Sequence, residues 1–166
     1  LDAIEAARRS NGPDDTRPHI AHIQVIHPDD LARFARHDVV ANAQPFWATH
    51  DAQMDRLTIP FLGPVRATWQ YPFRSLLDAG ATLAMGSDWA VSTASPLLEM
   101  EVAVTRVGQN PAGERAPFLP DQLLDLEDAL AAFTTGSAWC NNLERDLGTV
   151  EVDKTSDLHV LHPLPF

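Results

Sequence analysis

The sequence predicts an α/β fold built from βα units, in which helices alternate with the strands of a parallel sheet or barrel. Three observations support this prediction. Segments with helical periodicity alternate with short apolar runs along most of the 166 residues. Proline and glycine residues stand between these segments, where turns are needed. Apolar residues make up 45% of the chain, which is enough for one sizeable core and speaks against a disordered protein.

The expected helices and strands follow one another in a regular order. Helices are expected at 1–9, 28–36, 72–77, 96–107 and 126–139. Strands are expected at 19–26, which has the composition of a buried strand, at 39–44 and at 81–85. Pro28 and Pro72 stand at helix starts, where the fixed φ of proline suits the first turn.

Two regions stand outside this alternation. Residues 46–70 are expected to form a long irregular loop, and a loop of that length in a compact domain is usually functional. Short strands are expected at 147–152 and 157–161, in a small sheet of their own. We therefore expect one domain over 1–145 and the start of another over 146–166.

Composition narrows the classes of partner and location. Twelve basic and 23 acidic side chains give a net charge of -11, which repels nucleic acid and anionic membranes. The single cysteine, Cys140, cannot form an internal disulfide, which favours a reducing compartment such as the cytoplasm. The chain has neither an apolar run long enough to span a membrane nor a signal-peptide pattern. Because it starts in helical pattern at Leu1 and stops without a terminal element, we expect a fragment of a longer protein.

Two histidines on the first expected strand are candidates for chemistry. Side chains three apart on a strand point to opposite faces, so His19 and His22 cannot serve the same site. His22 shares its face with Ile20 and Gln24 and lies toward the carboxyl end of the strand, where (β/α) barrels place their active sites. A hydrogen-bonded packing role remains the alternative for a lone strand histidine.

Asp88 follows the third strand after a Gly-Ser pair. Its face of that strand carries the small residues Thr82, Ala84 and Gly86, which leave room beside a carboxylate. A carboxylate in this position can bind a divalent cation and accept a proton from a water molecule that the cation activates. It can also cap the next helix or order a turn, and the residue alone does not separate these roles.

The sequence around these residues resembles that of the amidohydrolase superfamily, and more narrowly that of the branch that contains N-substituted formamide deformylases. The resemblance rests on four runs in order and on the tail: RPHIAHIQVIHPDDL at 17–31, VVANAQP at 39–45, YPFRSLLDAGA at 71–81, MGSDWAV at 85–91 and LGTVEVDKTSDLHVL at 147–161. It implies part of a (β/α)8 TIM barrel, with the three expected strands as barrel strands six to eight. It also implies that the tail enters a small C-terminal β-sandwich.

The resemblance assigns two site residues. His22 matches the family's metal-ligand histidine on strand six, and Asp88 matches the aspartate on strand eight that binds metal and acts as general base. The family often has glutamate where this chain has Ala21, so a contact that orients the ligand is expected to be missing. The family's ligands on strands one, four and five have no counterpart here. A catalytic zinc needs three protein ligands, so the site in this chain is expected to be incomplete.

Aromatic residues gather near the ends of the second and third strands. Trp47 and Trp89 would line the mouth of a barrel pocket and favour a small-molecule substrate with an apolar or aromatic group. Arg66 and His50 are candidates to orient a carbonyl or carboxylate of that substrate. Packing of each aromatic residue against its own loop, and solvation of the polar pair, are the alternatives.

The sequence therefore predicts a fragment of a metal-dependent hydrolase, with zinc the expected metal, that cleaves an amide or formamide-like C–N bond. Asp88 would take a proton from water and return it to the leaving nitrogen. As an isolated chain the fragment is expected to be inactive and to self-associate through its open sheet edges. One alternative is a stand-alone, non-catalytic binding or regulatory half-barrel. Another is a relative that has lost its metal.

Overall fold

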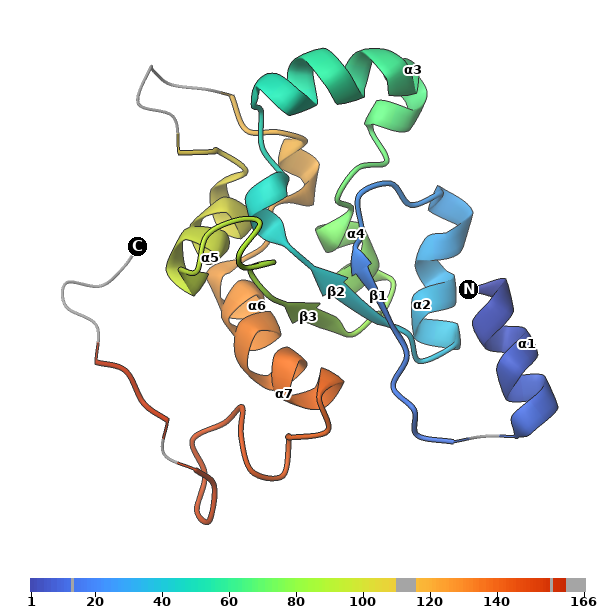
Figure 1. Ribbon diagram of the computed structural model, residues 1–166, viewed down its shortest axis with the longest axis vertical. Helices are drawn as coiled ribbons and strands as arrows, with labels where there is room; N and C mark the ends of the chain where they lie inside the picture. The colour runs from blue at the N-terminus through green and yellow to red at the C-terminus, as the bar shows by residue number, and fades with distance from the viewer. Residues whose placement is uncertain (13, 110–115, 156, 161–166) are drawn as a thin grey trace.

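The computed structural model describes residues 1–12, 14–109, 116–155 and 157–160. Helices and strands alternate along the chain, as the sequence predicts (Figure 1). The strands are β1 (His19–His22), β2 (Val40–Ala43) and β3 (Leu83–Met85). The α-helices are α1 (Asp2–Asn11), α2 (Leu31–Arg36), α3 (Ile59–Ala67), α4 (Phe73–Asp78), α5 (Pro96–Thr105), α6 (Leu126–Ala131) and α7 (Ser137–Cys140). Shorter helical turns are η1 (Pro28–Asp30), η2 (Pro45–Trp47), η3 (Met54–Thr58), η4 (Pro120–Gln122) and η5 (Ala132–Gly136).

The three strands form one parallel sheet in the order β1-β2-β3. The register aligns His22 with Ala43 and Ala43 with Met85, so the three strands end close to one line. Parallel strands joined by helical crossovers are the βα units that the sequence predicts. The sheet is consistent with part of a TIM barrel, in which each strand is followed by a helix.

One face of the sheet is covered by helices. Ala41 and Ala43 of β2 and Leu83 and Met85 of β3 belong to the hydrophobic core, together with buried residues of α2, α4, α5 and α6. The element α6–η5–α7 approaches β3 closely at Gly136, where an added Cβ would lie 2.0 Å from the carbonyl oxygen of Leu83. This stretch agrees with the helix expected at 126–139. The only residue type that permits this contact is glycine.

The first strand differs from the expected buried strand over 19–26. β1 ends at His22, and three of its four residues are exposed. The prediction of a buried strand was wrong because β1 is an outer strand of the sheet, and within 19–26 the core includes only Ile23, with Ile20 and Ile26 packed against it. Alternation of apolar residues in the sequence does not reveal whether a strand is central or at an edge.

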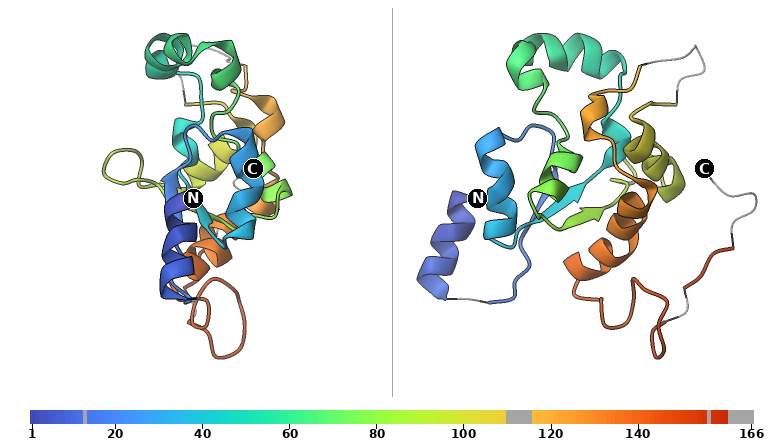
Figure 2. Two further views of the ribbon diagram at one scale, coloured as in Figure 1. Left: turned by 90° about the vertical axis from the view of Figure 1, so that its right-hand side faces the viewer. Right: turned by 180° about the vertical axis from the view of Figure 1, so that it is seen from behind.

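The loop expected at 46–70 is largely helical, which corrects the prediction of an irregular segment. It contains η2, the π-helical turn η3 and α3, which bends at Gly63 with φ of 74°. Pro60 lies in the first turn of α3, and the bend at Gly63 lets a second short helical piece with Pro64 follow the first. Figure 2 shows α3 at one end of the molecule, apart from the helices that cover the sheet.

The tail forms no strand within 141–155 and 157–160. The strand expected at 147–152 is therefore absent. Residues 157–160 of the second expected strand do not pair with a sheet either. Val150, Val152 and Val160 are 84%, 90% and 97% exposed. A pair of short strands is marginal without further strands to cover one face, which explains why the apolar pattern alone misled. Residue 161 lies outside the described residues, and the β-sandwich remains a prediction. No described helix has the length and apolar character needed to cross a membrane.

Candidate active site

The candidate site lies at the carboxyl ends of the strands, where the predicted residues His22 and Asp88 are found. His22 is the last residue of β1, and Asp88 follows β3 by three positions. The register places β1 and β3 on either side of β2, two strand spacings or about 10 Å apart. The structure thus brings the two residues to the same edge of the sheet without placing them in contact.

The backbone at His22 leaves the strand conformation. His22 has φ of 70° and Ile23 has φ of 54°, both in the left-handed region that non-glycine residues rarely adopt. The amide of Ile23 donates to the carbonyl of Ala21 at 2.9 Å, which closes a tight turn. This turn breaks the alternation of the strand, since Ile20 and Ile23 both pack against the core although they are three residues apart. His22 is thereby exposed rather than on the face of Ile20.

Gln44 holds this turn in place. Its side-chain Oε1 accepts the backbone N–H of His22 at 2.8 Å, and its Nε2 donates to Asn42 Oδ1 at 2.9 Å. Gln44 is only 5% exposed. A buried amide that uses both ends of its side chain fixes the orientation of its partners. The sequence analysis missed this residue, although a glutamine directly after an apolar strand was a visible signal.

Asp88 sits on a tight turn of its own. It has φ of 58° and is half-buried, and its carbonyl accepts the amides of Val91 at 2.7 Å and Ser92 at 3.2 Å. The hydroxyl of Ser92 donates to the carbonyl of Ser87. The backbone of Asp88 is therefore defined by its own loop, and its carboxylate is left available for chemistry.

A second carboxyl group, Glu99 of α5, lies behind this loop and was also missed. Glu99 is fully buried, and its Oε2 accepts the amide of Phe46 at 2.7 Å. Its Oε1 lies 3.2 Å from Ser92 Oγ. Burial raises the pKa of Glu99 to about 7, and the charge of Asp88 adds to that rise. The signal in the sequence was a glutamate in the otherwise apolar run Pro-Leu-Leu-Glu-Met.

The other predicted site residues have environments of their own. Trp47 is half-buried against the core, whereas Trp89 is 68% exposed. The Nε of Arg66 donates to the carbonyl of Leu62 at 2.9 Å, so this guanidinium folds back on α3. His50 Nδ1 lies 2.6 Å from Asp55 Oδ1. Their roles toward a substrate stay predictions.

His19 has a different environment from His22. Its Nδ1 lies 3.2 Å from the Sγ of Cys140 on α7. This contact occupies the histidine at the amino end of β1, away from the candidate site.

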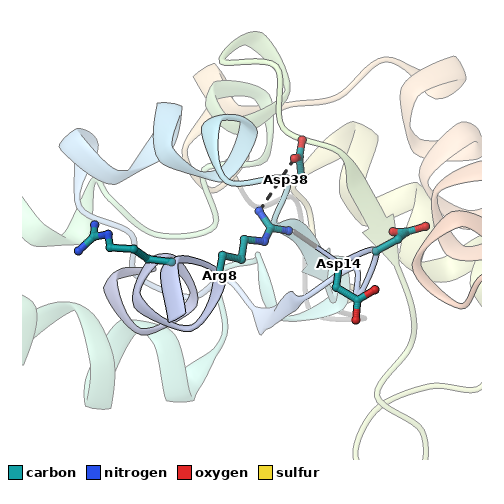
Figure 3. Close-up of a pocket in the computed structure, with 5 residues that line it drawn as sticks. Arg8, Asp14 and Asp38 are labelled. Atoms are coloured by element: carbon teal, nitrogen blue, oxygen red, sulfur yellow. Dashed lines mark ion pairs between the residues drawn. The ribbon is translucent and has the colours of Figure 1, made fainter. Parts of the chain in front are cut away.

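A surface hollow at the opposite end of the strands is a less suitable site. Its lining includes Arg8, Asp14 and Asp38, and the guanidinium Nη1 of Arg8 lies 3.9 Å from Oδ2 of Asp38 (Figure 3). Asp38 precedes β2, so the hollow belongs to the amino ends of the strands, whereas ligand sites of parallel α/β folds lie at the carboxyl ends. Within the described ranges, no group of three or more His, Cys, Asp or Glu residues is placed to hold a metal ion.

Comparison with known sequences gives consistent matches. The model of the amidohydrolase family matches residues 1–166. Protein LONG AFTER FAR-RED 3 of Arabidopsis thaliana is 35% identical over 97% of this chain and 27% of its own length. N-substituted formamide deformylase of Arthrobacter pascens is 29% identical over 97% of this chain and 28% of its own length. The chain thus spans less than a third of each of these relatives.

Solved hydrolase structures superpose on most of this chain, which covers less than a third of each of them. An uncharacterized metal-dependent hydrolase from Pyrococcus horikoshii superposes with a TM-score of 0.76 at 26% identity, over 98% of this chain and 31% of that chain. Atrazine chlorohydrolase from Arthrobacter aurescens, complexed with zinc, superposes with a TM-score of 0.54 at 25% identity, over 83% of this chain and 26% of that chain.

Proposed function

Because the chain belongs to the amidohydrolase family, we propose that it supplies the carboxyl-end loops of barrel strands six to eight to a metal-dependent hydrolase that cleaves a C–N bond. The observation that carries the proposal is the placement of His22 and Asp88 at the same edge of one parallel sheet. The similarity to a formamide deformylase supports an amide or formamide-like substrate.

The side chains of His22 and Asp88 are of the types that bind zinc in proteins. Imidazole and carboxylate are both zinc ligands, and His22 is exposed and Asp88 half-buried at the sheet edge. They do not complete the site in number, since a catalytic zinc needs three protein ligands. We therefore propose that the remaining ligands come from a part of the barrel outside this chain, in line with the share of each relative that the chain spans.

Each residue has a distinct task in the proposed reaction. Zinc, when bound, supplies Lewis acidity that activates water and polarises the substrate carbonyl. Asp88 accepts the proton of the attacking water and transfers it to the leaving nitrogen. Gln44 fixes the backbone that presents His22. Trp47 and Trp89 provide apolar surface for a substituent on the substrate. To contact the substrate, the guanidinium of Arg66 would have to give up its hydrogen bond to the carbonyl of Leu62.

The test is the substitution Asp88→Asn in the hydrolase that contains this chain. The change keeps the volume of the side chain but removes the proton acceptor, so the turnover of an N-substituted formamide should fall by about 10³-fold or more. Asp121→Asn is the control, because Asp121 is an exposed residue of η4. Turnover within about threefold of the unmodified enzyme for Asp88→Asn would overturn the proposal.

A stand-alone, non-catalytic half-barrel is the second candidate. It is favoured by the absence of a three-ligand group among the described residues. Such a module would bind its partner without zinc, whereas the proposed hydrolase would require it. In either case β1 and β3 are the outer strands of the described sheet, which leads us to propose that the isolated chain self-associates.

A further inference from the structure

One buried carboxyl group joins the two loops that frame the candidate site. Glu99, the fourth residue of α5, is 0% exposed. Its Oε2 accepts the amide of Phe46, which lies in η2 directly after β2, at 2.7 Å. Its Oε1 lies 3.2 Å from Oγ of Ser92, in the loop after β3. The contacts span 53 and 7 positions in sequence, so this single side chain connects three separate segments.

Ser92 carries this connection to Asp88. The hydroxyl of Ser92 donates to the carbonyl of Ser87, and its backbone amide donates to the carbonyl of Asp88 at 3.2 Å. Ser92 therefore holds the backbone on both sides of the Ser87–Asp88 peptide. A displacement of Ser92 would move Asp88, although Glu99 itself does not touch Asp88 through any described hydrogen bond.

Burial favours the neutral form of this carboxyl group. Glu99 is fully buried, and no cation pairs with it among the described ion pairs. Ser92 Oγ lies within hydrogen-bonding distance of both the Ser87 carbonyl and Glu99 Oε1, but its single proton can serve only one of them at a time. A neutral Glu99 can supply the proton of its contact with Ser92 and accept the Phe46 amide with its other oxygen.

We propose that Glu99 is a positioning residue that, as a neutral acid, ties the loop after β2 to the loop after β3 and thereby holds Asp88 in place for proton transfer. The proposal rests on the proposed function, in which Asp88 is the base. It assigns Glu99 no contact with substrate or metal. Its effect on catalysis passes through Ser92 and the peptide between Ser87 and Asp88.

Glutamine is the informative replacement for Glu99. Its amide has nearly the shape of the neutral acid, with an oxygen that can accept from Phe46 and an NH₂ group that can donate to Ser92. Alanine removes both contacts and leaves a cavity behind the loop. A residue that worked as a buried anion would instead be damaged by both replacements.

The experiment compares kcat and KM of the zinc-loaded hydrolase that contains this chain with those of its Glu99→Gln and Glu99→Ala variants. Glu99→Ala should lower kcat by about tenfold to a hundredfold with a smaller change in KM, since a misplaced catalytic group costs about this much. Glu99→Gln should restore kcat to within about threefold of the unmodified enzyme. Glu101→Gln, an exposed glutamate on the same helix, is the matched control. Unchanged kcat in Glu99→Ala, or equal losses in both variants, would overturn the proposal.

Two further measurements separate this proposal from the proposed function. Ser92→Ala tests the connection if Glu99→Ala does not fold, since it should lower kcat by itself. Where Glu99→Ala does fold, the losses in kcat of the two alanine variants should not be additive. Amide hydrogen exchange at Phe46 and Ser92, measured without substrate, should rise in Glu99→Ala and not in Glu99→Gln. If Asp88→Asn keeps its turnover, the proposed function fails while the exchange result still reports on the loops. If Asp88→Asn is inactive and the exchange rates of all variants are equal, the positioning role alone is wrong.

Discussion

The helix-covered face of the sheet and the loops at its carboxyl end are held together by different means. On the covered face, apolar side chains of β2 and β3 pack against helices, and Gly136 lies directly on the backbone of β3. In the loops, the buried polar side chains Gln44 and Glu99 accept hydrogen bonds from the backbone amides of His22 and Phe46, respectively. Packing of the first kind stabilises the fold without specifying direction. Hydrogen bonds of the second kind fix the orientation of particular residues.

This difference predicts a separation of effects. Substitutions on the covered face should lower the free energy of unfolding and leave the chemistry of folded molecules unchanged. Substitutions in the loops should change metal binding or turnover more than they change stability. Variants on the covered face and in the loops test whether stability and metal binding respond separately.

Gly136→Ala should produce the largest loss of stability. The added Cβ would meet Leu83 O at 2.0 Å, and this oxygen belongs to strand backbone that cannot move aside easily. We expect the free energy of unfolding to fall by about 3 kcal/mol, the upper range for overpacking. Urea denaturation measures this value. Gly86→Ala is the control, because a Cβ at Gly86 has no neighbour within 4 Å, and an equal loss in both variants would contradict the packing argument.

Gln44→Leu should weaken zinc binding more than it weakens the fold. The change keeps the approximate size of the side chain but removes the acceptor for the amide of His22. Loss of a contact that orients a ligand typically lowers metal affinity by about 10-fold to 100-fold. Competition titration with a zinc chelator measures this affinity in the hydrolase that contains the chain. Gln53→Leu, an exposed glutamine, is the control, and equal affinity in both variants would show that Gln44 does not support His22.

The pH dependence of stability reports on the protonation state of Glu99. Burial raises the pKa of Glu99 to about 7 from an ordinary 4.5. Between these values the folded state binds a proton that the unfolded state has lost, so this contribution to stability is full below pH 4.5 and is lost as pH rises through 7. Denaturation at pH 5 and pH 8 should show a smaller difference in Glu99→Gln than in the unmodified chain. The same difference in both would mean that Glu99 titrates normally.

Much of the architecture was predictable from local sequence. Periodicity identified the alternation of helices and strands, because it depends on residues close together in the chain. The bent helix α3 was not predicted, and nothing in the sequence shows that Gly63 provides the bend that accommodates Pro64. The exposure of β1 depends on its place at the edge of the sheet, which periodicity does not encode.

The site was predictable only in part. His22 and Asp88 were proposed as site residues from resemblance to a family, which carries information about chemistry that spacing does not, and their roles stay predictions. The alternation argument for His22 relied on a regular strand, but its φ of 70° ends that regularity. Glu99 could not be placed from the sequence, since its role depends on a contact with Phe46, 53 residues away.

The central claim, which rests on the proposed function, is that His22 and Asp88 are both zinc ligands in a hydrolase that contains this chain. The most direct test is an anomalous difference map, recorded at the zinc absorption edge from crystals of that hydrolase. We predict zinc density about 2.0–2.2 Å from a ring nitrogen of His22 and about 2.0–2.2 Å from a carboxylate oxygen of Asp88. A fully occupied zinc peak that touches neither side chain would contradict it.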